Sequence, residues 1–188
     1  MLSICIASGC SLTKDDVDYC KGKGRVYVVS DNYRLAPWAD VLYSCDAQWW
    51  DFHLGAPKFI GEKWCLEEEA AKRWGLNHIK QSKEIVSFTQ GEIGTGGNSG
   101  YQAINLAVLQ GAKKIILLGY DMKLGEHKRS HWFGEHPAKL TRSSRHDEWV
   151  KKFNLAAPFY KEAGIEIINC TKDTALECFE RKDLRDVI

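Results

Sequence analysis

One stretch of the sequence constrains the fold more than any other. A glycine-rich loop at residues 91–101 opens an amphipathic helix expected at 100–109, and a continuously apolar strand at 114–119 follows and leads to Asp121. A loop with little side-chain bulk lets a ligand approach backbone amides, and a helix start adds N–H groups without intrahelical partners. The stretch therefore predicts a seat for an anionic or nucleotide ligand, with a simple turn before a core helix as the structural alternative.

Short runs rich in valine and isoleucine alternate with longer helical patterns along the whole chain. This alternation is typical of parallel strands joined by helical crossovers. We therefore predict a single Rossmann-like α/β domain over residues 1–188, with a mostly parallel sheet covered by helices on both faces. Strands are expected at 2–7, 25–29, 41–45, 84–88, 114–119 and 166–169, and helices at 14–20, 47–53, 62–74, 100–109, 146–163 and 174–179. Pro158 predicts a kink or a restart in the 146–163 helix.

The composition limits the kinds of partner that the protein is expected to bind. A net charge of +1, from 26 basic and 25 acidic residues, gives no overall attraction to nucleic acid or to a membrane surface. The apolar start is short and lacks the basic flank of a signal peptide, and no apolar run approaches the length of a membrane span. Seven scattered cysteines include no C-x-x-C pair, which argues against disulfides and structural zinc. We expect a cytoplasmic protein whose partner is a small molecule.

Loops that follow strands are where site residues are expected, because open α/β sheets bind ligands beyond the carboxyl ends of their strands. Short polar side chains and glycines in such loops could bind phosphate, ribose or a base, although serine and aspartate there also serve as helix caps. The candidate nucleotide-binding residues are Ser8, Gly9, Ser11, Asp31, Asn32, Asp46, Asn98, Ser99 and Gly100. We expect the loop at Gly100 to lie outside the core, so that a bulky residue there would block a ligand and spare the fold.

The least regular segment, 122–144, follows the acid that terminates a buried strand. Such a carboxylate must be solvated, hydrogen-bonded or bound to a ligand. Imidazole has an unperturbed pKa of about 6.5, so a histidine in this segment could act as a general base. The histidine spacing matches no metal motif and no metal site is predicted. The candidates are His136, His131 and Asp121 for catalysis, and His127, Arg129 and Arg142 for phosphate.

These loops resemble a domain shared by bacterial family-42 sialyltransferases, Maf-type flagellin glycosyltransferases and archaeal hydroxymethylpterin pyrophosphokinases. That domain has a Gly-x-Gly-Pro-Ser-Leu loop after its first strand, which Ala-Ser-Gly-Cys-Ser-Leu at 7–12 matches in part. Its Thr-Ser-Gly helix start is similar to Asn-Ser-Gly at 98–100, and its Gly-x-Lys-x-Ile-x-x-x-Gly-x-Asp strand is similar to residues 111–121. Small uncharacterised phage proteins with the His-Trp-Phe-Gly-Glu-His-Pro run, here at 131–137, are similar as well.

The resemblance implies a GT-A-like fold and assigns roles by position. In that family the first loop and the Ser-Gly helix start hold a cytidine nucleotide, and a histidine after the Gly-x-Asp strand is the general base. Those roles would fall on Gly9, Ser11 and residues 98–100, and on His131 or His136. The family's phosphate-binding tyrosine pair has no counterpart at 122–144, and basic residues of that segment would take its place.

The sequence therefore predicts a nucleotide-binding transferase. The leading hypothesis is a glycosyltransferase that uses a nucleotide-activated sugar, a small hydroxyl acceptor and a histidine base, with no required cofactor. One alternative is a Mg²⁺-dependent pyrophosphokinase or nucleotidyl-transfer enzyme, in which Asp121 and Asp46 would hold the ion. The other is a phage protein that binds and sequesters a nucleotide without turnover. An oligomer is compatible with each of these.

Overall fold

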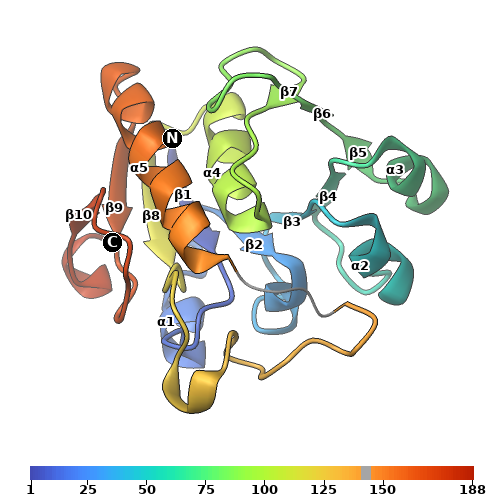
Figure 1. Cartoon of the computed structure of the whole chain (residues 1–188), viewed down its shortest axis with the longest axis horizontal. Helices are drawn as coiled ribbons and strands as arrows, with labels where there is room; N and C mark the ends of the chain where they lie inside the picture. The colour runs from blue at the N-terminus through green and yellow to red at the C-terminus, as the bar shows by residue number, and fades with distance from the viewer. Residues whose placement is uncertain (141–144) are drawn as a thin grey trace.

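The centre of the protein is a parallel eight-stranded sheet in a computed structural model that describes residues 1–140 and 145–188 (Figure 1). The strand order is β10-β9-β8-β1-β2-β3-β4-β5, and every neighbouring pair is parallel. The strands are β1 (Leu2–Ile6), β2 (Arg25–Val29), β3 (Val41–Ser44), β4 (Glu62–Cys65), β5 (Asn77–His78), β8 (Lys114–Leu118), β9 (Glu166–Asn169) and β10 (Glu180–Arg181). Two further short strands, β6 (Lys80–Gln81) and β7 (Glu92–Ile93), form a separate parallel pair.

Helices cover both faces of this sheet, which confirms the predicted α/β architecture. The helices are α1 (Lys14–Tyr19), α2 (Ala47–Phe52), α3 (Glu68–Trp74), α4 (Ser99–Leu109) and α5 (His146–Glu162), with 3-10 turns η1 (Ser30–Arg34), η2 (Glu126–Lys128) and η3 (Leu184–Asp186). Successive side chains of a strand point to opposite faces, so β1 contributes to two cores. Ile4 and Ile6 pack in the core with α1, α2 and α3, whereas Cys5 packs in the core with α4 and α5. Figure 1 shows α4 and α5 side by side over one face.

The strand order reverses between β1 and β8. From β1 the chain moves outward through β2 and β3, and it later returns to place β8 on the other side of β1. Such a reversal leaves a crevice beyond the carboxyl ends of the two central strands. Just past those ends the Gly9 N–H donates to the Gly119 carbonyl at 2.8 Å. A Cβ on Gly9 would lie 2.0 Å from Asp121 Oδ1, so only glycine fits this close approach.

Two predicted helices are wrong in part or in whole. The predicted 62–74 helix is split, because Glu62–Cys65 pairs with β3 as strand β4 and only Glu68–Trp74 is helical. Residues 174–179 form no helix, because the Thr174 side chain makes hydrogen bonds to the backbone that fix a non-helical conformation. The Thr174 hydroxyl accepts from the Leu176 N–H and donates to the Tyr120 carbonyl. Helix α5 continues through Pro158 without a break.

The predicted strand at 84–88 is also wrong, because helix α4 provides its hydrogen bonds in place of a neighbouring strand. Asn105, fully buried on α4, accepts from the Ser87 and Gly94 N–H groups at 2.9 and 2.7 Å and donates to the Ser87 carbonyl at 2.7 Å. The Tyr101 hydroxyl donates to the Ile85 carbonyl at 2.6 Å. Ile85 and Val86 pack into the core that contains α4, and residues 84–88 form no strand ladder.

None of the described helices is long and apolar enough to span a membrane.

Asn105→Ala should destabilise the fold strongly. The change leaves two N–H groups and one carbonyl without their partner, and each buried unsatisfied group costs about 1–3 kcal/mol. We expect the free energy of unfolding, measured in urea, to fall by roughly 3–5 kcal/mol. Asn154→Ala is the matched control, since Asn154 is exposed on α5, and it should change stability by less than about 0.5 kcal/mol. Equal effects of the two substitutions would contradict this account of the segment.

Candidate functional site

A cavity of about 180 Å³ opens at the strand-order reversal, beyond β1 and β8. The first loop and the glycine-rich loop meet there, because Ser8 and Gly9 line it together with residues 98–100. A second cavity of about 190 Å³ adjoins it toward the end of β3. The two share the lining residues Ser30, Asn98, Ser99, His131, His136 and Trp149. We call the two together the switch-point cleft.

Two buried N–H donors on the wall of the cleft have no protein acceptor among the described residues. Asn98 caps α4 through Oδ1, which accepts from the Tyr101 N–H at 2.8 Å, and this bond fixes the amide so that Nδ2 is the group left over. Trp149 Nε1, in the first turn of α5, is the second such donor. A buried donor without an acceptor costs about 1–3 kcal/mol. A ligand with acceptor oxygens would relieve that cost.

Ser99 and Gly100 fix the start of α4 rather than presenting side chains. The Ser99 hydroxyl accepts from the Cys45 N–H at 3.0 Å and donates to Cys45 Sγ, so it ties α4 to the end of β3. Gly100 is buried, and a Cβ there would lie 3.2 Å from the Tyr120 ring. The expectation that Gly100 lies outside the core is therefore wrong, and a bulky residue there would disturb the packing of α4 on the sheet.

His131 and His136 both line the cleft, on the turn that follows η2. Their ring centroids are 4.8 Å apart, and Phe133 stacks on His131 at 5.0 Å. Burial, with a smaller contribution from the neighbouring His136, lowers the pKa of His131 to about 4. His131 is therefore neutral near pH 7 and is a weak proton acceptor there.

Asp31 and Asn32 lie behind the cleft, outside its lining. Asp31 Oδ2 accepts from Trp49 Nε1 at 2.9 Å and lies 3.6 Å from His136 Nδ1. Asn32 is fully buried; its Nδ2 donates to the Ile6 carbonyl at 2.9 Å, and its Oδ1 accepts from Trp132 Nε1 at 2.7 Å. These two residues, which the sequence predicts as nucleotide ligands, instead contact residues 131–136, which we call the histidine turn.

Asp121 lines the cleft and anchors the first loop. The Ser11 backbone N–H and hydroxyl both donate to its carboxylate at 2.7 Å. Burial raises the pKa of Asp121, and the two bonds from Ser11 act against that rise. Ser11 itself does not line the cleft. Asp46 lines the β3 side and caps α2, accepting from the Gln48 N–H at 3.0 Å.

The two phosphate candidates that the structure describes lie outside the cleft. His127 and Arg129 are exposed and line neither cavity, and Arg142 lies outside the described residues. Several lining residues are not among the candidates from the sequence, including Ser30, Lys123, Ser130, His146 and Trp149. His146 and Trp149 begin α5, so a helix start directly after the irregular segment was the signal that could have found them.

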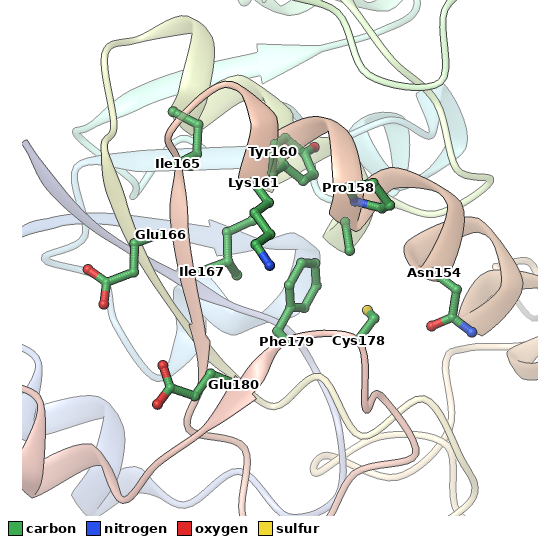
Figure 2. Close-up of a pocket in the computed structure, with 11 residues that line it drawn as sticks. Asn154, Pro158, Tyr160, Lys161, Ile165, Glu166, Ile167, Cys178, Phe179 and Glu180 are labelled. Carbon is green, nitrogen blue, oxygen red and sulfur yellow. The ribbon is translucent and has the colours of Figure 1, made fainter.

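A larger groove of about 730 Å³ lies elsewhere, between α5 and the edge of the sheet. Figure 2 shows the apolar side chains of Ile167 and Phe179 projecting into it. It reaches Ile165 and Glu166, at the amino end of β9, whereas parallel sheets bind ligands beyond the carboxyl ends of their strands. None of the candidate residues that the structure describes lines this groove, so the switch-point cleft is the better candidate site.

Comparison with known proteins supports this fold. No protein-family model matches the chain, and a search of curated proteins finds no match. Among solved structures the chain is similar to a structure described as MAf glycosyltransferase from Magnetospirillum magneticum AMB-1, with a TM-score of 0.66 and 9% sequence identity. The match covers 100% of this chain and 34% of that one, so this chain spans about a third of that glycosyltransferase.

This similarity establishes a Maf-like, glycosyltransferase-like α/β fold, as the resemblance to that family implied. The resemblance to the sialyltransferases, the pyrophosphokinases and the phage proteins stays a prediction.

Acid should destabilise the fold through His131. Its folded pKa of about 4 lies below the ordinary value of 6.5, so between these values the unfolded chain binds a proton that the folded chain does not. The penalty is absent above about pH 6.5, grows as the pH falls, and is complete below about pH 4, at roughly 1–3 kcal/mol. Urea denaturation across this window should show a smaller loss of stability for His131→Asn than for the parent.

The matched control for this acid effect is His127→Asn. His127 is exposed and has a φ of +56°, which asparagine tolerates. This variant should keep the parent's pH dependence, and identical behaviour of the two variants would rule out burial of His131 as the cause.

Proposed function

We propose that the chain is a nucleotide-binding glycosyltransferase that takes a nucleotide-activated sugar and transfers it to a small hydroxyl acceptor. The observation that carries the proposal is the pair of buried donors, Asn98 Nδ2 and Trp149 Nε1, on one wall of the switch-point cleft. Both donate and neither accepts, so they match the carbonyl and phosphate oxygens of a nucleotide. The glycosyltransferase-like fold agrees with this reading.

The start of α4 supports an anionic ligand at the same wall. The first N–H groups of a helix have no intrahelical acceptor, and the helix dipole favours negative charge there. Lys123 also lines the cleft, where its ammonium pairs with Asp173, so it would have to exchange that carboxylate for a ligand phosphate. The two cavities together lie near the lower end of the range of about 300–1,000 Å³ that is typical of small-molecule sites.

The chemistry that we propose is a direct displacement at the sugar. His136 takes the proton of the acceptor hydroxyl while the acceptor oxygen forms a bond to the anomeric carbon. The bond from that carbon to the phosphate oxygen breaks, and its electron pair leaves with the nucleotide. Lys123 and the donors of the cleft wall would stabilise the leaving phosphate. His136 is preferred to His131 as the base, because the lowered pKa of His131 makes it a weak acceptor.

A thermal-shift screen against CMP, UMP, GDP, ADP, ATP and their sugar conjugates, with and without Mg²⁺, tests the proposal at its first step. A ligand at about 100 times its dissociation constant should add about 2.7 kcal/mol of stability. Stabilisation that needs both a triphosphate and Mg²⁺ would favour the pyrophosphokinase or nucleotidyl-transfer alternative. Tight binding without release of sugar would favour a sequestering protein, and no stabilisation by any nucleotide would end the proposal.

Removing either donor should weaken the nucleotide that this screen identifies. Trp149→Phe keeps the aromatic ring and removes the Nε1 donor, while Asn98→Asp keeps an oxygen to cap Tyr101 and removes the Nδ2 donor. Each change should weaken affinity roughly tenfold or more, because hydrogen bonds to charged groups are worth about 1.5–3 kcal/mol. Isothermal titration calorimetry measures the loss.

Trp64→Phe is the matched control for the donor variants, since Trp64 lies on β4 outside the cleft and donates to Glu62. It should bind the nucleotide as the parent does. Unchanged affinity in both Trp149→Phe and Asn98→Asp would exclude this wall as the nucleotide site.

His136→Gln should lower turnover without weakening nucleotide binding. General base catalysis contributes about 10²–10⁴ to the rate, so release of nucleotide from the sugar donor should slow by at least about a hundredfold. His78→Gln on β5, far from the cleft lining, should keep the parent's rate. Parent-like turnover in His136→Gln would exclude it as the base, and stoichiometric zinc or manganese lost on the substitution would replace base catalysis with a metal site.

A further inference from the structure

Asp31 is the most crowded carboxylate near the cleft. Its side chain is almost fully buried, and it follows Ser30, whose φ of +48° is costly for a residue other than glycine. The backbone therefore bends at a strained residue just before this acid. Four groups face the carboxylate: Trp49 Nε1, His136 Nδ1, His53 Nε2 and Arg34 Nη1, at 2.9, 3.6, 3.7 and 3.6 Å.

We infer that Asp31 is a positioning residue that orients His136, and not the nucleotide ligand that its place after β2 predicts. This inference rests on the proposed function of His136 as the base. Asp31 does not line the cleft, and its negative charge would repel a phosphate. The bond from Trp49 to Oδ2 holds the carboxylate in one orientation, with the same oxygen toward His136.

The Oδ2–Nδ1 distance of 3.6 Å is longer than a hydrogen bond, but the negative charge of the carboxylate favours the tautomer of His136 that carries its proton on Nδ1. The lone pair is then on Nε2, which is the nitrogen that must accept the hydroxyl proton of the acceptor. After the transfer His136 is an imidazolium with a proton on each nitrogen, and the charge of Asp31 offsets its positive charge. The neighbouring His131, edge-on at 4.8 Å, further restricts the ring of His136.

The other groups around Asp31 compete little for its charge. Burial lowers the pKa of His53, so that imidazole is neutral near pH 7, and the Tyr33 hydroxyl lies 3.3 Å from its Nδ1. Arg34 is the remaining cation at this carboxylate among the described residues; its side chain is half-exposed and faces the other oxygen, Oδ1. Ion pairs of exposed side chains are weak, so Arg34 does not displace His136 as the neighbour of Oδ2.

The test is the tautomer of His136, read from the ring ¹⁵N chemical shifts of histidine-labelled protein at a pH where the ring is neutral. In the parent we expect the proton on Nδ1. Asp31→Asn keeps an acceptor for Trp49 and removes the charge, and we expect it to move the His136 population toward the Nε2–H form. Turnover of the sugar donor should fall on the order of 10²-fold or more, with the KM for the donor unchanged.

Asp40→Asn is the matched control, because Asp40 accepts from the Val26 N–H at 2.7 Å near the amino end of β2 and lines neither cavity. It should leave the tautomer of His136 as in the parent. An Nε2–H tautomer in the parent would overturn the inference even if Asp31→Asn does not fold. So would a tautomer that Asp31→Asn leaves unchanged.

The tautomer of His136 can be measured independently of nucleotide binding and turnover. The tautomer needs no ligand, so an Nδ1–H tautomer in a protein that binds no nucleotide would end the glycosyltransferase proposal and leave the pairing of Asp31 with His136 in place. Normal nucleotide binding and turnover in Asp31→Asn would end the positioning role alone.

Discussion

The pairing of β1 with β8 is the constraint on which the rest of the molecule depends. The two strands are more than a hundred residues apart in the chain, and their parallel register runs from Leu2 opposite Lys114 to Ile6 opposite Leu118. The pairing continues beyond the strands, since the Gly9 N–H donates to a carbonyl of the partner loop. Ser11 then closes the connection on the carboxylate that follows β8. These contacts fix the position of the first loop beside the crevice that the strand order creates.

The histidine turn depends on a second set of contacts, which are polar. Trp132 provides them: its backbone N–H donates to the Ser8 carbonyl at 3.1 Å and its indole N–H donates to Asn32 at 2.7 Å. Asn32 in turn donates to the end of β1. A segment without long regular structure thus gains a fixed position from two hydrogen bonds of one residue, and the neighbouring His131 is carried to the cleft wall with it.

Local pattern predicted the central sheet because its strands are apolar on both faces, which few other structures require. It could not predict residues 84–88, which are apolar and partly buried like a strand, because their hydrogen bonds go to Asn105 on α4, a partner from another part of the chain. The same limit applies to the site. The positions of the strand ends predicted that the first loop and the glycine-rich loop meet, because the carboxyl ends of parallel strands lie at one edge of the sheet. They could not predict that Asp31 would bond Trp49 and stay out of the cleft lining, nor that Trp149 would reach the cleft from α5.

Several features that destabilise the fold lie around the cleft. Ser30 and Met122, both lining it, are non-glycine residues in the left-handed region, with φ of +48° and +50°. Asn98 and Trp149 leave donors unsatisfied on its wall, and His131 is held neutral by burial. The larger groove beside β9 has one such unpaired group, the buried Tyr160 hydroxyl, and none of its described lining residues has a positive φ. Backbone strain and unpaired donors persist where the surrounding structure compels them, and proteins retain them chiefly at sites where a ligand recovers the cost. The strained and unpaired groups around the smaller cleft therefore favour it as the ligand site, although the groove has the larger volume.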